Sequence, residues 1–213
     1  MICVSLAEKT LKALGAALPL YPFAEIRLDA TDDLSQETVK KIFALHPRLI
    51  AACRPGRISE AERSDLLSAA VHAGAAYVDI EIETEPVLQQ KIISAARACG
   101  CRTIVSFHDY ERTPLRAYLE EVRRRGFEAG ADIVKIACLS RGADDNARLL
   151  GLLDYPKPVV AFGMGPAGKI TRLIAPLLGA PFTYASPAAG RETAPGQLEA
   201  GFIRRTWEAW ENG

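Results

Sequence analysis

The sequence has no excess of charge of either sign and no apolar run long enough to cross a membrane. Lysine plus arginine and aspartate plus glutamate each number 26 in 213 residues. The overall charge therefore gives no reason to expect nucleic acid or an anionic membrane as a partner. The first residues, Met-Ile-Cys-Val-Ser-Leu-Ala, lack the basic segment of a signal peptide. We expect a cytoplasmic protein.

Cysteine and histidine are scarce, with five and three copies. The odd cysteine number and the apolar neighbours of most of these residues predict buried thiols in a reducing compartment, and no disulfides. Cys99 and Cys101 are separated by one residue, and no second cysteine pair or nearby histidine completes a zinc set. We expect neither a metal nor a cofactor.

Short apolar segments alternate with helical stretches along the whole chain. The predicted strands cover residues 1–7, 23–29, 48–54, 77–83, 102–109, 133–139, 158–164 and 182–186. Eight strands, each followed by a helix, is the order of an α/β protein with a (β/α)8 TIM barrel. No linker interrupts this order, so we predict a single catalytic domain over residues 1–213. A doubly wound open sheet is the alternative, because periodicity alone does not separate the two.

Helix start signals fit this scheme. The first helix is expected over residues 8–18 and the second after Asp33 or Ser35. Ser59 and Glu62 have the spacing of a capping box. Thr113 and Pro114 predict the start of a helix that ends near Gly126, and the last helix is expected over about 195–210.

Lys135 interrupts one of the apolar segments, Ile-Val-Lys-Ile-Ala. Lysine is rarely buried without a partner. A buried ammonium group tends to lose its proton, and the neutral amine attacks carbonyl carbons. Lys135 is therefore a candidate Schiff-base lysine. The alternatives are a lysine whose amine reaches solvent and an ion pair with Glu81.

Charged residues share one face of several predicted strands, because side chains alternate along a strand. The apolar faces should pack on helices, so the charged faces point into the barrel. There, charges at the carboxyl ends of strands are typical of catalysis. Each residue also has a structural interpretation: a core histidine for His108, an intra-strand pair for Glu25 and Arg27. The shared faces comprise Glu25, Arg27 and Asp29; Asp79, Glu81 and Glu83; Ser106 and His108; and Ile133, Lys135 and Ala137.

The glycine-rich stretch 163–169, Gly-Met-Gly-Pro-Ala-Gly-Lys, follows the seventh predicted strand. Its glycine spacing is similar to that of the phosphate-binding loops common in barrels. By itself this spacing is a weak signal.

Seven motifs in register, spread over nearly the whole chain, resemble the type I 3-dehydroquinate dehydratase family. They are Glu25-Ile-Arg27-Leu-Asp29, Cys53-Arg54-Pro55, Asp79-Ile-Glu81, Ser106-Phe-His108-Asp109, the segment Gly-Ala-Asp-Ile-Val-Lys-Ile-Ala around Lys135, the segment 164–172 ending in Arg172, and Thr193-Ala-Pro-Gly-Gln197. Threonine replaces the family's serine twice, at Thr171 and Thr193.

The resemblance implies a barrel enzyme of the shikimate pathway that converts 3-dehydroquinate to 3-dehydroshikimate and needs no cofactor. Lys135 would form an imine with the C3 ketone, and His108 would transfer the protons. Arg172 would bind the substrate carboxylate. The other substrate-binding residues would be Glu25, Arg27, Arg54, Thr193 and Gln197, supported by Asp79 and Glu81. Residues 190–197 would form a lid over the substrate, and a homodimer is compatible with the family.

One departure from the family concerns the histidine. The family has a glutamate, four residues after the arginine of its Cys-Arg-Pro motif, that orients the catalytic histidine. Here Ile58 occupies this register. We expect Glu60 to belong to the following helix, so that Glu81 or water orients His108. The remaining alternatives are a class I aldolase or transaldolase-like Schiff-base enzyme, which needs a phosphate site, and a catalytically silent barrel that binds a hydroxy acid.

Overall fold

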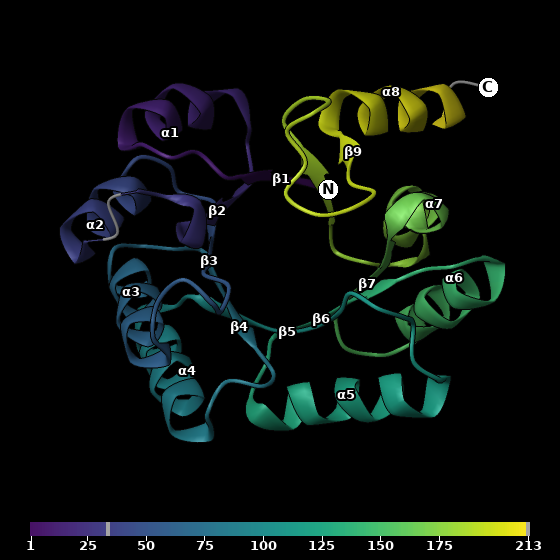
Figure 1. Ribbon diagram of the computed structural model, residues 1–213, viewed down its shortest axis with the longest axis horizontal. Coiled ribbons are helices and arrows are strands. Elements are labelled where there is room, and N and C mark those ends of the chain that lie inside the picture. The colour runs from purple at the N-terminus through teal and green to yellow at the C-terminus, as the bar shows by residue number, and fades with distance from the viewer. Residues whose placement is uncertain (33–34, 212–213) are drawn as a thin grey trace. The chain divides into compact units, whose positions relative to one another are not determined.

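The computed structural model describes residues 1–32 and 35–211 (Figure 1). The chain divides into two compact units. Unit 1 comprises Met1–Ser5, Phe107–Arg125 and Ile133–Gly213, and unit 2 comprises Leu6–Ser106 and Gly126–Asp132.

Unit 2 is built on strands that pair in chain order. β2 pairs with β3, β3 with β4 and β4 with β5, all in parallel. In Figure 1 the helices α2, α3 and α4 follow one another along these strands. The elements are β2 (Ala24–Arg27), β3 (Leu49–Ala52), β4 (Tyr77–Glu81), β5 (Arg102–Asp109), α1 (Leu11–Ala17), α2 (Gln36–Ala44), α3 (Glu60–His72), α4 (Pro86–Cys99) and the 3-10 turns η1 (Leu18–Leu20) and η2 (Leu28–Ala30).

Unit 1 contains two sets of parallel strands. β6 pairs with β7, and β1 pairs with β8, which also pairs with β9. The elements are β1 (Ile2–Leu6), α5 (Arg116–Ala129), β6 (Ile133–Leu139), α6 (Ala143–Leu150), η3 (Gly151–Leu153), β7 (Val159–Met164), α7 (Gly165–Ile174), η4 (Ala175–Leu178), β8 (Thr183–Ser186), β9 (Leu198–Glu199) and α8 (Ala200–Glu211).

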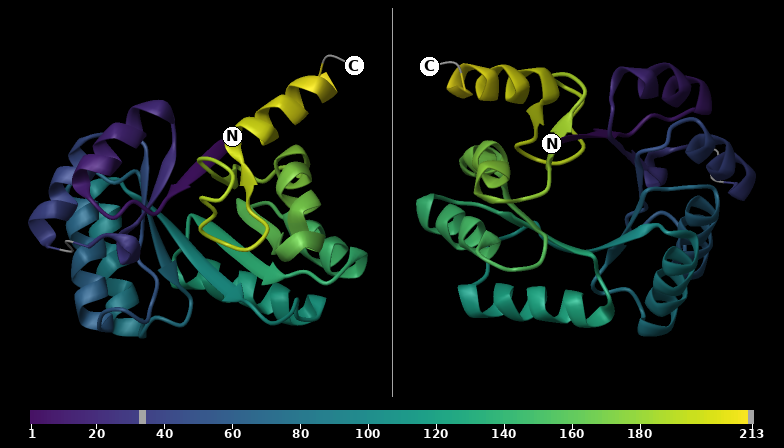
Figure 2. Two further views of the ribbon diagram at one scale, coloured as in Figure 1. Left: turned by 45° about the horizontal axis from the view of Figure 1, so that its top comes forward. Right: turned by 180° about the vertical axis from the view of Figure 1, so that it is seen from behind.

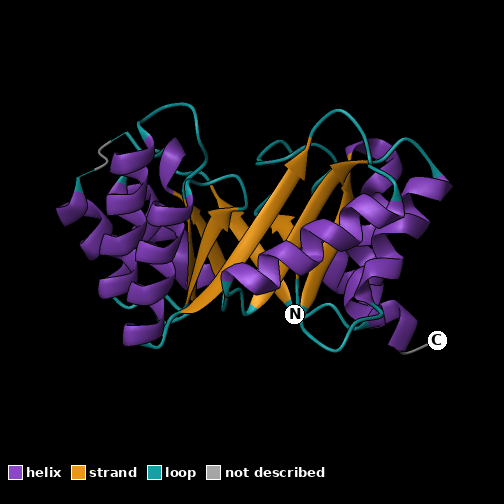
Figure 3. Ribbon diagram, turned by 90° about the horizontal axis from the view of Figure 1, so that it is seen from below, coloured by secondary structure: helices purple, strands orange, loops and turns teal. Residues whose placement is uncertain are grey.

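The predicted (β/α)8 order is confirmed. Each of β1 to β8 precedes a helix, and the first strand pairs with the eighth. That pairing is expected of a barrel, whereas a doubly wound sheet places its first strand in the centre. Within each unit the helices lie along one side of the strands (Figure 3).

Several helix starts agree with the sequence. Ser59 and Glu62 form the predicted capping box at α3, with the Ser59 Oγ accepting from the Glu62 amide. Ser35 is the N-cap of α2, while Asp33 lies outside the described residues. Thr10 caps α1, which begins at Leu11, three residues later than expected. These side chains satisfy amide groups that lack partners in the first turn of a helix.

Other boundaries were predicted wrongly. Helix α5 begins at Arg116 instead of Pro114, and the Thr113 hydroxyl donates to the carbonyl of Leu139. It also passes through Gly126 and ends at Ala129, before Gly130 with φ +108°. Residues 195–199 form a loop and β9, so the last helix begins only at Ala200.

Strands β2 and β4 end earlier than predicted, at Arg27 and Glu81. Asp29 therefore lies in η2, and Glu83 lies beyond its strand. No helix in the described ranges is both long and apolar enough to span a bilayer.

Candidate active site

Lys135 is buried, as its apolar neighbours predicted. It lies in the middle of β6 in unit 1, beside Val160 of β7, and is 3 % exposed. Its Nζ is 4.1 Å from the centroid of the Tyr184 ring, on β8 of the same unit. A cation above the face of an aromatic ring is attracted by the negative potential of that face. The amine is therefore shielded from bulk solvent and faces the Tyr184 ring.

Arg172 is fully buried in helix α7 of unit 1. Its Nη1 donates to the backbone carbonyl of Tyr184 at 3.4 Å, and its Cζ lies 4.2 Å from the centroid of the Phe162 ring. The Nε and Nη2 groups have no hydrogen-bond partner among the described residues. Burial lowers the pKa of Arg172 to about 9. A planar guanidinium with two unused donors is suited to a carboxylate.

The glycines of 163–169 allow α7 to approach β7. A Cβ on Gly168 would come within 2.4 Å of the Gly163 backbone. The Gly165 amide already donates to the carbonyl of Pro195 at 3.0 Å. This stretch therefore serves close packing and holds the loop before β9, and its geometry is not that of a phosphate cradle.

His108 lies near the end of β5, in the part of that strand from Phe107 onward that belongs to unit 1, and is half-buried. Its ring stacks on Tyr110, with centroids 6.1 Å apart and planes inclined by 14°. Glu60, the nearest carboxylate in sequence to the register of Ile58, is the first residue of α3 and forms a close ion pair with Arg63. That pairing agrees with the expectation that Glu60 belongs to the helix.

A second group of predicted residues gathers in unit 2 around Arg54. Its Nη2 lies 3.2 Å from Oδ2 of Asp79, and its Nη1 forms a close ion pair with Glu81. Nη1 also lies 3.3 Å from the Ser106 hydroxyl, which donates to Asp79 Oδ1 at 2.5 Å. Burial lowers the pKa of Arg54, but the charges of Asp79 and Glu81 outweigh it and raise that pKa. The predicted supporting carboxylates thus contact Arg54 directly.

Asp29 connects this group to Arg27. It accepts two hydrogen bonds from the Arg27 guanidinium and one, at 3.1 Å, from the backbone amide of Arg54. Burial raises the pKa of Asp29, but the hydrogen bonds and the charge of Arg27 outweigh it and hold that pKa below its usual value. Glu25, on the same face of β2 as Arg27, is 3 % exposed.

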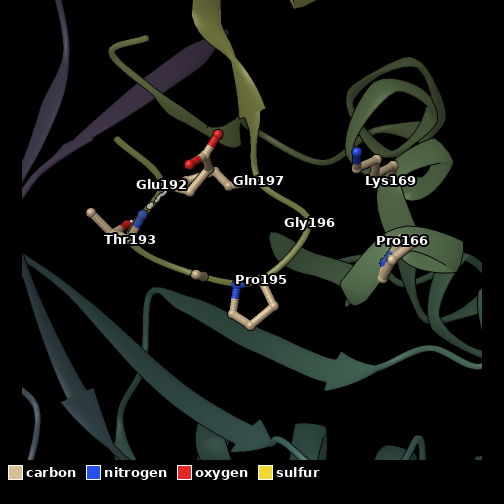
Figure 4. A pocket seen from close by; sticks show the side chains of 8 residues that line it. Pro166, Lys169, Glu192, Thr193, Pro195, Gly196 and Gln197 are labelled. Carbon is tan, nitrogen blue, oxygen red and sulfur yellow. Dashed lines mark hydrogen bonds between the residues drawn. The ribbon is translucent and has the colours of Figure 1, made fainter. Parts of the chain in front are cut away.

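The loop 187–197 carries Thr193 and Gln197, and it lies beside α7 (Figure 2). The Thr193 amide donates to Oε1 of Gln197 at 2.8 Å, and the Thr193 hydroxyl donates to Ser5 Oγ at 2.8 Å. The outer side of the loop borders a pocket of about 530 Å³, with Lys169 of α7 on the other wall (Figure 4). Gly196, with φ +72°, has no room for a Cβ against Gly165.

The predicted site residues therefore divide between the two units. Unit 1 holds Lys135, His108, Arg172, Thr193 and Gln197, and unit 2 holds Glu25, Arg27, Arg54, Asp79 and Glu81. Sequence reasoning did not assign site roles to Ser5, Asp29, Ser106 and Tyr184. For Ser106 and Asp29 a signal was present, because both share a strand face or a motif with assigned residues.

A family model and known relatives match nearly the whole chain. The sequence model described as type I 3-dehydroquinase matches residues 2–212. A 3-dehydroquinate dehydratase of Methanocaldococcus jannaschii is 30 % identical over 219 residues, covering 97 % of each chain.

Solved structures of known proteins share the fold of this chain. The 3-dehydroquinate dehydratase of Aquifex aeolicus is 27 % identical with a TM-score of 0.79, covering 97 % of this chain and 98 % of its own. The type I enzyme of Clostridium difficile, solved with covalently modified comenic acid, is 21 % identical with a TM-score of 0.86, covering 99 % and 92 %. From the family model and the relatives together, the chain belongs to the type I 3-dehydroquinase family.

Proposed function

We propose that this chain is a 3-dehydroquinate dehydratase, a hydro-lyase that forms 3-dehydroshikimate and water from 3-dehydroquinate. The observation that carries the proposal is the pairing of two buried cations through Tyr184. Its ring faces the Lys135 amine, and its carbonyl accepts from Arg172. A buried amine supplies the nucleophile, and a buried guanidinium with unused donors supplies the carboxylate anchor.

The reaction begins with attack of the Lys135 amine on the C3 ketone. Loss of water from the adduct leaves an iminium ion, which withdraws electrons and acidifies the proton on C2. His108 accepts that proton, and the electron pair forms the C1–C2 double bond as the C1 hydroxyl leaves. His108 returns its proton to this hydroxyl, which departs as water. Addition of water to the iminium then releases the product and restores the amine.

His108 suits this role because imidazole both accepts and donates protons near neutral pH. Its position near the end of β5 agrees with the location of catalytic groups in barrels, at the carboxyl ends of the strands. Glu60 is engaged by Arg63. We infer that a group other than Glu60 orients His108.

The remaining residues bind and orient the substrate. Arg172 binds the carboxylate, and the hydroxyl groups are bound by Glu25, Arg27, Arg54, Thr193 and Gln197. Asp79 and Glu81 hold the Arg54 guanidinium in place, as their contacts indicate. The loop 190–197, in which the Thr193 amide donates to Gln197, acts as the lid that carries both of these residues. No cofactor takes part in these steps.

Borohydride reduction tests this proposal against its two alternatives. With 3-dehydroshikimate present, borohydride should fix a secondary amine on Lys135, detected by mass spectrometry of the peptide. Lys135→Met should abolish the adduct, and Lys169→Met, which removes a lysine outside the buried cluster, should retain it. Adducts with sugar phosphates only would indicate an aldolase, and no adduct with any carbonyl compound would indicate a silent barrel. The aldolase is not favoured, because the family model that matches residues 2–212 is that of type I 3-dehydroquinase.

We further propose a cytoplasmic location and no nucleic-acid or membrane partner, supported by five free thiols and balanced charge. A homodimer of a single-domain chain over residues 1–213 is part of the same proposal. Sedimentation of the purified protein measures its oligomeric state.

A further inference from the structure

The hydroxyl of Ser186 is buried at the carboxyl end of β8. Ser186 is 0 % exposed, and its Oγ has no hydrogen-bond partner among the described residues. Buried polar groups in proteins are nearly always hydrogen-bonded, so each exception requires an explanation. A ligand atom that completes the hydrogen bond is one such explanation.

Ser186 lies on the same face of β8 as Tyr184, whose ring contacts Lys135. Side chains alternate along a strand, so Ser186 and Tyr184 project to the same side. The Tyr184 ring on that side covers the Lys135 amine. Ser186 lies two residues further toward the carboxyl end of the strand, where barrel enzymes bind their substrates.

Two polar neighbours flank Ser186 within unit 1. β1 pairs with β8 through Val4 and Ala185, and continuing this register places Ser5 beside Ser186. The Ser5 hydroxyl accepts a hydrogen bond from Thr193 of the lid loop. On the other side, the carbonyl of Tyr184 accepts from Arg172, whose Nε and Nη2 also lack partners in the described part of the chain. The Ser186 hydroxyl and the Nε and Nη2 groups of Arg172, which have no partner among the described residues, therefore all lie near the carboxyl end of β8.

We propose that Ser186 is a further substrate-binding residue, whose hydroxyl donates to an oxygen of the carboxylate bound by Arg172. The inference rests on the proposed function, because it assigns Ser186 to the same substrate. The ligand is a hydroxylated cyclic carboxylic acid, and its anionic oxygens have acceptor capacity beyond the two donors of Arg172. A short hydroxyl at the end of a rigid strand is pre-positioned for this contact.

Thr183 provides a matched control in the same strand. Its Oγ1 is also buried and without a partner among the described residues, and Thr183 is 1 % exposed. Because it is adjacent to Tyr184, it projects to the opposite face of β8. Thr183→Val and Ser186→Ala therefore each remove one buried hydroxyl, on opposite sides of the sheet.

The test measures binding of quinate, which has the carboxylate but no C3 ketone, by calorimetry. We expect Ser186→Ala to weaken quinate binding and to raise KM about 10-fold, as for loss of a hydrogen bond to a charged group. Thr183→Val should leave both values unchanged, and neither variant should lower the melting temperature. As a second readout, an analogue with a carboxamide in place of the carboxylate should bind wild type and Ser186→Ala with closer affinities than quinate does.

Unchanged quinate binding in Ser186→Ala, or an equal loss in Thr183→Val, would overturn the assignment of Ser186. Failure of the proposed function gives a different result. In that case wild-type protein forms no borohydride-stable adduct with 3-dehydroshikimate, whatever residue occupies position 186.

Discussion

Asp29 binds the Arg27 guanidinium through both of its carboxylate oxygens, with distances of 3.0 Å from Nε to Oδ1 and 2.6 Å from Nη2 to Oδ2. The same Oδ1 accepts from the backbone amide of Arg54. One carboxylate therefore fixes the side chain of one proposed substrate-binding arginine and the main chain of another. Bidentate geometry of this kind determines the orientation of the guanidinium as well as its charge state.

Asp29→Asn should weaken substrate binding more than it slows the chemical step. An amide replaces one acceptor with a donor, which opposes an Arg27 N–H group, so the guanidinium loses its fixed orientation. We expect KM to rise about 10-fold, in line with the loss of one charged hydrogen bond, and kcat to change less. Steady-state kinetics measure both, with Asp32→Asn, a change at an exposed aspartate, as the control. A fall in kcat with constant KM would contradict this role.

The same carboxylate predicts a part of the acid sensitivity of the protein. The pKa of Asp29 in the folded protein lies below its usual 3.8. A lowered pKa means that the unfolded state binds more protons, so the stabilisation is fully present above the usual value and is lost as the pH falls through the lowered one. Urea unfolding between pH 3 and 6 should therefore show a steeper loss of stability in wild type than in Asp29→Asn. Parallel curves would exclude Asp29 as the source.

Arg172→Met should abolish carboxylate binding and stabilise the ligand-free protein. The guanidinium is fully buried with two nitrogens, Nε and Nη2, that have no hydrogen-bond partner among the described residues, and methionine fills similar space without that cost. We expect quinate to bring no rise in melting temperature in this variant, while the ligand-free melting temperature increases by about 2–4 °C for each 1 kcal/mol regained. Differential scanning calorimetry with and without quinate measures both effects. A variant that melts earlier than wild type would show that Arg172 is a structural residue.

Glu60→Ala should leave most of the activity intact. The Glu60 side chain is half-exposed and pairs with Arg63, which also donates to the Cys53 carbonyl and the Thr84 hydroxyl. Because those two contacts remain, we expect a loss of about 1 kcal/mol or less in the free energy of unfolding. Activity assays should place this variant near wild type and far above His108→Ala. A collapse to the level of His108→Ala would mean that Glu60 orients the histidine.

The fold and most of the proposed site could be predicted because they depend on local patterns. Alternation of charged and apolar residues placed Asp79 and Glu81 on one face, and the structure brings both to Arg54. The burial of Lys135 followed from its apolar neighbours in the same strand. Such patterns predict on which side of a strand a residue lies, because successive side chains alternate between only two faces.

Contacts between distant segments could not be predicted in this way. Thr113 has the sequence features of an N-cap, but its hydroxyl donates to a carbonyl at the end of β6. The ring of Tyr184 covers Lys135 only because β8 and β6 meet in space. β9 has only two residues, Leu198 and Glu199, too few for a periodic signal.

The contact between Gly163 and Gly168 makes the position of Arg172, the proposed carboxylate-binding residue, sensitive to mutations at sites that contact no ligand. A single methyl group at either glycine would meet backbone atoms within 2.8 Å, so helix α7 would have to move away from β7. Arg172 would move with it, since it lies one turn further along the same helix. We expect a substitution at either glycine to weaken the binding of a carboxylate inhibitor without any change in Arg172 itself.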